Sequence, residues 1–114
     1  MNKTSYTSAK GNVKPSPDII KIRIRNWVEK RYVGNFSSLN PELRRAVVWC
    51  LHDRFQFSNV NIASTISASK RTIIRDIQAA ELYMKVSKRF QTRVDEMEDY
   101  ILYNSKYIHW FSVY

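Results

Sequence analysis

The segment over residues 60–81, VNIASTISASKRTIIRDIQAAE, constrains the fold of this chain more than any other. It holds two runs of apolar residues at helical spacing, separated by the polar tripeptide Ser67-Ala68-Ser69. Ser69 can cap the second run by accepting a hydrogen bond from a backbone N–H two or three residues later. Ala63 is small at the point where the first helix must approach the second. The segment therefore predicts a helix-turn-helix, in which a short first helix braces a second one.

Helical patterns also cover most of the remaining sequence. Ser16-Pro17-Asp18 and Asn40-Pro41-Glu42 each place a capping side chain before a proline and an acidic residue, which is typical of a helix start. Three apolar stripes at helical spacing comprise Ile20, Ile24, Trp27 and Val28; Leu43, Val47, Leu51 and Phe55; and Phe90, Val94, Met97 and Ile101. Residues 20–25, IKIRIR, also alternate with period two, as strands do, but no second convincing strand is there to pair with them. We therefore expect an all-α fold of about five helices around a central helix-turn-helix, with a break between Lys85 and Lys88.

The length and composition of the chain suit one domain. It has 114 residues, of which 44% are hydrophobic, so it can bury a small core of its own. Residues 1–15 are polar and contain three lysines, and we expect a disordered basic arm there. Residues 16–114 are expected to form the single helical domain. Its last part carries aromatic residues at helical spacing, which either pack back onto the domain or meet a second protomer; they are Tyr103, Tyr107, Trp110 and Tyr114.

The charge of the chain is strongly positive and unevenly distributed. The sequence contains nineteen Lys and Arg residues and ten Asp and Glu residues, which gives a net charge of +9. Through Arg93 there are 18 basic and 6 acidic residues, whereas from Val94 onward there are 1 basic and 4 acidic residues. The positive excess therefore lies with the helix-turn-helix and the segments before it. Such a field attracts polyanions, of which nucleic acid is the commonest, although an anionic membrane surface or a solubility charge are the alternatives.

The second helix of the motif carries cationic and hydrogen-bonding side chains on the positions left exposed. In helix-turn-helix proteins this helix lies in the major groove of duplex DNA. Arginine can pair with guanine, glutamine with adenine, and Ile74 can contact the methyl group of thymine. The expected groove contacts are Arg71, Thr72, Arg75 and Gln78, with Ser69 at the helix start. The expected phosphate contacts are Lys70, Arg44, Arg45, Lys85, Lys88 and Arg89. Asp76 and Glu81 are expected to brace the exposed arginines or to keep the helix soluble.

The run SASKRTIIRDIQAAE resembles the turn and recognition helix of DeoR-type and related winged-helix transcription regulators, in which an S-x-x-T-I-x-R-D-[IL] pattern recurs. The matching residues are Ser69, Thr72, Ile73, Arg75, Asp76 and Ile77. The resemblance covers about 22 of the 114 residues. It implies that the recognition helix reads the major groove and that Arg71, Thr72 and Arg75 contact DNA. Ser67 stands where that turn usually carries glycine, and the sequence after Glu81 is helical, so no wing is expected.

The helices around the motif, over roughly residues 41–102, are similar to the duplex-binding C-terminal domain of the bacterial replication initiator DnaA. The resemblance implies that an arginine on the helix before the motif reaches the minor groove, and Arg44 is the matching residue. The Asp-His-Thr-Thr run of that family is absent, because Ser69-Lys70-Arg71-Thr72 stands in its place. The same target sequence is therefore not expected. The chain also lacks the GxxxxGK[ST] pattern of a nucleotide-binding loop.

Motifs of enzyme chemistry are absent from the sequence. His52 and His109 have no partner at metal-ligand spacing, and the lone Cys50 lies in an apolar run that suits a buried thiol. The acidic residues between Asp95 and Asp99 are expected to form a solvated helix face. We therefore expect no enzyme, no cofactor and no metal. The sequence has no signal-peptide core and no membrane span, so a cytoplasmic protein without a membrane partner is expected.

These observations predict sequence-specific binding of double-stranded DNA through a helix-turn-helix, in a transcription regulator. A homodimer through the aromatic C-terminal helix is a further hypothesis, because paired half-sites are common for this motif. Alternatives are a DnaA-like replication protein, a transposon or phage packaging component that recruits DNA, and a helix-turn-helix that binds protein. RNA binding is less expected, because the deep and narrow major groove of A-form RNA excludes a recognition helix.

Overall fold

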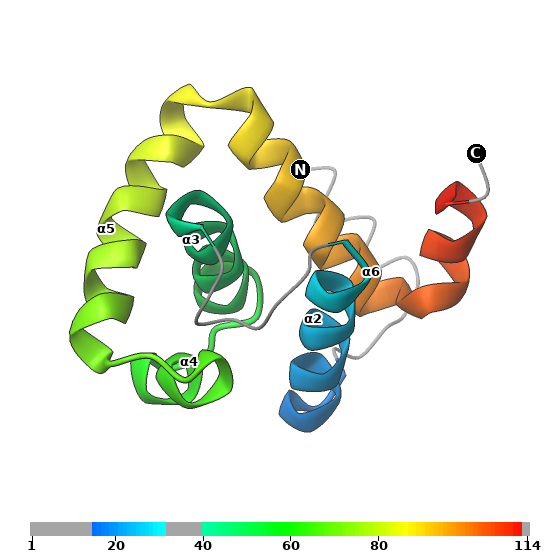
Figure 1. The fold of residues 1–114 in the computed structure, drawn as a ribbon, viewed down its shortest axis with the longest axis horizontal. Helices are drawn as coiled ribbons and strands as arrows, with labels where there is room; N and C mark the ends of the chain where they lie inside the picture. The colour runs from blue at the N-terminus through cyan, green and yellow to red at the C-terminus, as the bar shows by residue number, and fades with distance from the viewer. Residues whose placement is uncertain (1–14, 32–39, 113–114) are drawn as a thin grey trace.

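The computed structural model describes residues 15–31 and 40–112, and it describes side chains as far as Tyr103, with the exception of Arg31. Within these residues the fold is all-α, with five α-helices and no strand. The helices are α2 (Pro17–Arg31), α3 (Pro41–Trp49), α4 (Asn59–Ile66), α5 (Lys70–Val86) and α6 (Lys88–Ser112), and α3 continues into a π-helical turn, η2 (Cys50–Arg54). Figure 1 shows α3 in the middle, with α5 on one side of it, α2 and α6 on the other, and α4 near the start of α5.

Capping side chains define the helix starts. The Asn40 side chain accepts a hydrogen bond from the Leu43 amide at 2.8 Å, with Pro41 at the first helical position, as the sequence predicts. The predicted start at Ser16 is also confirmed, because α2 begins at Pro17. Helix α4 begins at Asn59, and its capping residue is Ser58. Its hydroxyl oxygen accepts from the Asn61 amide at 3.1 Å.

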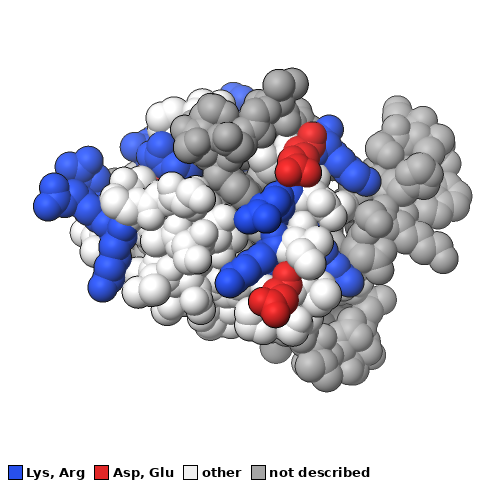
Figure 2. Space-filling model, turned by 60° about the horizontal axis from the view of Figure 1, so that its bottom comes forward, with Lys and Arg blue, Asp and Glu red and all other residues white. Residues whose placement is uncertain are grey.

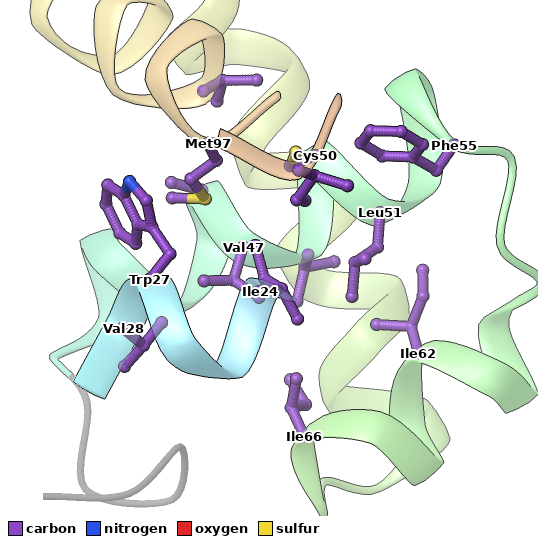
Figure 3. Packing of buried hydrophobic residues seen from close by; sticks show 14 of the residues in the cluster. Ile24, Trp27, Val28, Val47, Cys50, Leu51, Phe55, Ile62, Ile66 and Met97 are labelled. Carbon is purple, nitrogen blue, oxygen red and sulfur yellow. The ribbon is translucent and has the colours of Figure 1, made fainter. Parts of the chain in front are cut away.

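The core is built by the predicted apolar stripes. The side chains of Ile24, Trp27, Val47, Leu51 and Met97 point toward one another between α2, α3 and α6 (Figure 3). Every residue of the three stripes is buried, and Ile62 and Ile66 of α4 and Ile73 of α5 join the same cluster. Burial of apolar surface on this scale is the main force that holds such a domain together. The segment IKIRIR is helical because Ile20 and Ile24 both face this core, whereas Ile22 stays exposed.

The helices after the motif follow the predicted break. Helix α5 ends at Val86, and the Ser87 hydroxyl caps α6 by accepting from the Phe90 amide at 3.1 Å. No wing follows α5 in the described part of the chain, because α6 occupies that place. Two expectations lie outside the described residues: most of the basic arm (1–14), and the packing of the side chains of Tyr107, Trp110 and Tyr114. None of the described helices is long and apolar enough to cross a membrane.

Candidate nucleic-acid interface

The turn between α4 and α5 reverses the chain within three residues. Ser67 takes the left-handed conformation (φ 57°, ψ 49°) and donates its backbone N–H to the Ala63 carbonyl, which ends α4. The Ala68 amide donates to the same carbonyl at 3.0 Å. A positive φ costs a residue with a Cβ atom free energy that glycine avoids. Glycine would adopt this conformation without that cost, and the turn joins the two predicted helices, α4 and α5.

The start of α5 is capped as predicted. The Ser69 hydroxyl oxygen accepts from the Thr72 amide at 3.1 Å and lies 3.0 Å from the Thr72 hydroxyl. Both hydroxyl groups are therefore used in part within the first turn of the helix, although each can still make one further hydrogen bond to a ligand. The backbone N–H groups of the first turn point out of the N-terminus of α5, and the helix dipole makes this N-terminus positive. An anion is therefore favoured at this end of α5.

The outer face of α5 carries three of the predicted groove contacts and the predicted phosphate contact Lys70, whereas the fourth groove contact, Thr72, is half-buried. Lys70, Arg71, Arg75 and Gln78 are all exposed. Within the described part of the chain, none of these four side chains has a hydrogen-bond or ion-pair partner. Ile74 lies among them with 42% of its surface exposed. In Figure 2, basic side chains project from the left edge, the side on which α5 lies in Figure 1, whereas the acidic side chains that stand out in this view lie in the right half.

Asp76 is the contact point between α5 and α3. Its side chain is only 1% exposed, and its two oxygens accept from Arg44, with Nε at 2.7 Å and Nη2 at 3.1 Å. The Arg45 Nε donates to the same carboxylate at 3.4 Å. The hydrogen bond with Asp76 also raises the pKa of the Arg44 guanidinium, so that Arg44 stays charged. The result is a two-arginine clamp on one buried carboxylate, which fixes the rotation of α5 about its own axis.

This clamp changes the roles expected for Arg44 and Arg45. Both were predicted to bind phosphate, and Arg44 was the minor-groove candidate. Their side chains are 25% and 29% exposed and are committed to Asp76, and Arg45 also donates to the Tyr83 hydroxyl at 3.0 Å. Their contacts favour a structural role. Asp76 does not brace the exposed arginines either, because its partners come from α3. Its position three residues after Ile73 and four before Ala80 places it on the buried face of α5.

The remaining phosphate candidates lie at the far end of α5. Lys85, Lys88 and Arg89 are exposed, but Lys85 is fifteen residues beyond Lys70. At 1.5 Å per residue this is roughly 22 Å along the helix. That distance is about twice the width of the major groove, ~12 Å. The structure therefore separates them from the residues on the first two turns of α5.

A second ionic cluster stabilises the other side of the domain. Burial lowers the pKa of Arg54, but hydrogen bonds to Asp95 and Glu98 outweigh this effect and raise it. The Arg54 guanidinium lies 3.0 Å from the Asp95 carboxylate and also contacts the carboxylate of Glu98. Glu98 is buried, with 7% of its surface exposed. The acidic stretch of α6 was predicted to be a solvated face, and this is wrong for Glu98, which joins α6 to η2. Glu98 lies four residues after Val94 and three before Ile101, and this spacing places it on the buried face of α6.

Similarity to known proteins does not add to this geometry. Comparisons with protein-family models, with curated proteins and with solved structures find no match to the chain. Among the described residues there is no group of three or more His, Cys, Asp or Glu side chains that could hold a metal ion. The outer face of α5 is therefore the candidate site on its geometry alone.

Proposed function

We propose that this protein binds double-stranded DNA in a sequence-specific manner and acts as a transcription regulator. The N-terminal half of α5 enters the major groove, and α4 braces it from behind. The observation that carries the proposal is the unpaired set of Lys70, Arg71, Arg75 and Gln78 on the exposed face of a capped recognition helix. Side chains without internal partners keep their hydrogen-bond donors available for phosphates and base edges.

The division of roles follows from position along α5. Lys70 and the free amides of the first turn suit a phosphate, because they lie at the positive end of the helix dipole. Arg71, Arg75 and Gln78 follow one another along the helix at intervals of three or four residues and suit base edges. The net charge of +9 adds long-range attraction to the duplex. The proposal includes the cytoplasmic location expected from the sequence.

The test compares two double variants that remove the same charge. Arg71→Ala/Arg75→Ala removes two cations from the proposed interface, and Lys21→Ala/Lys30→Ala removes two from α2, on the other side of α3 (Figure 1). Affinity is measured by fluorescence anisotropy on the duplex selected most strongly from a random pool. We expect the first variant to lose at least about tenfold in affinity, because each bidentate base contact is worth about 1–3 kcal/mol. Equal affinities of the two variants would contradict the proposal.

Pairing of two copies through the aromatic C-terminal segment remains part of this proposal. Two protomers would present two recognition helices to half-sites about one turn of DNA apart, roughly 34 Å. Sedimentation of the full chain over a concentration series tests this, and a monomer at every concentration would remove it. The DNA-binding proposal itself does not depend on the dimer.

A further inference from the structure

Ile74 is an apolar side chain placed in the middle of a cationic face. It is 42% exposed, although a β-branched residue at a solvated helix position gains nothing from water and is a weaker helix former than alanine. Its neighbours along the exposed face are Lys70, Arg71 and Gln78, at intervals of three or four residues. These neighbours suit phosphates and base edges. Ile74 therefore offers an apolar contact at the centre of an otherwise polar surface.

The clamp on Asp76 prevents Ile74 from turning inward. Successive residues of an α-helix are rotated by about 100°, so Ile74 and Asp76 point in nearly opposite directions. Asp76 is held by Arg44 at 2.7 Å and by Arg45 at 3.4 Å on the inner side. Any rotation of α5 that buried Ile74 would pull the Asp76 carboxylate away from both arginines. Ile74 is thus fixed at the centre of the outer face.

The major groove offers one apolar group on the edges of the four standard bases, the C5-methyl group of thymine. We infer that Ile74 reads this methyl group, so that the target of the protein contains a thymine beneath the centre of α5. The inference rests on the proposed function and adds the chemistry of one base position to it. Ile74 then acts as a specificity-determining residue that discriminates thymine from uracil and from unmethylated cytosine.

The test replaces single thymines by deoxyuridine, which lacks only the methyl group. The probe is the duplex selected from a random pool, and each thymine is exchanged in turn. At one position we expect the affinity of the unaltered protein to fall about fourfold, which corresponds to the burial of one methyl-sized group. Ile74→Ala is expected to bind the thymine duplex more weakly and to lose this sensitivity at that position. Leu82→Ala removes another exposed apolar side chain of α5, 63% exposed, and should retain it.

The outcomes separate this inference from the proposed function. If Arg71 and Arg75 are needed for binding but no thymine is sensitive to the exchange, or if Ile74→Ala keeps the sensitivity, the thymine contact is overturned and the DNA-binding proposal stands. A selection that recovers no common sequence overturns the thymine contact as well. If the protein binds no duplex, both fail. Circular dichroism of Ile74→Ala verifies that the helical fold is retained.

Discussion

At the scale of single residues, Asp76 has the largest structural consequence of any charged side chain near the interface. It is buried at 1% exposure and is shared by Arg44 and Arg45. A buried carboxylate that loses its partners costs far more than an exposed ion pair contributes. Through this carboxylate the two arginines of α3 are joined to the helix that carries Arg71 and Arg75.

Removal of both clamp arginines tests this role. Arg44→Ala/Arg45→Ala leaves Asp76 buried without a cation, and we expect the free energy of unfolding to fall by about 3–5 kcal/mol in urea denaturation. Adding Asp76→Asn to this variant removes the uncompensated charge and should restore part of the loss. If the double variant is as stable as the unaltered protein and loses only DNA affinity, the two arginines are phosphate ligands, as the sequence suggested.

Ser67 is a second residue whose backbone conformation has a measurable cost. Its φ of 57° places a residue with a Cβ atom in the left-handed region. We expect Ser67→Gly to raise the free energy of unfolding by about 0.5–1 kcal/mol, since glycine avoids the steric cost but loses more backbone entropy on folding. Ser64→Gly, at an exposed position inside α4, is the matched control and should destabilise by about 0.5 kcal/mol. A loss of stability in Ser67→Gly would show that the serine side chain compensates for the strain.

At the scale of elements, the sequence predicts helices well where capping side chains and apolar stripes coincide. The start at Asn40 and the stripe from Leu43 to Phe55 specify α3 and η2 together, because local hydrogen bonding and burial both favour the same helix. The capping role of Ser58 was missed because no proline or acidic residue follows it. The ion pairs were missed because they join α3 to α5 and η2 to α6, and a single sequence does not indicate which charged residues meet across helices.

The N-terminus of α5 allows stability and DNA binding to be separated. Ser69→Asp keeps a capping oxygen for the Thr72 amide, and a negative charge suits the helix dipole, so the stability of the protein should be unchanged or slightly higher. The same carboxylate faces the phosphates and should weaken DNA binding. Ser69→Ala removes the capping oxygen, so the free energy of unfolding should fall by about 1 kcal/mol. Anisotropy and urea denaturation measure the two effects, and unchanged DNA affinity in Ser69→Asp would place the duplex elsewhere.

At the scale of the whole molecule, the distribution of charge determines how binding depends on salt. The basic excess lies before Val94, and the acidic excess follows it. Each phosphate neutralised contributes about −0.9 to the slope of log affinity against log salt. Arg71→Ala/Arg75→Ala should make this slope less steep by about 0.9 for each arginine that also neutralises a phosphate. Lys21→Ala/Lys30→Ala should leave the slope nearly unchanged. Identical slopes in both variants would mean that the α5 arginines contact bases alone.

The central claim is that the outer face of α5 enters the groove of a DNA duplex. The most direct measurement is an NMR titration of the isotope-labelled protein with its selected duplex, followed through backbone amide resonances. We expect the largest shifts on the first turns of α5, at Lys70, Arg71, Ile74 and Gln78, with small shifts in α2 and in the buried part of α6. The largest shifts on α2 or α6, with α5 unaffected, would contradict it.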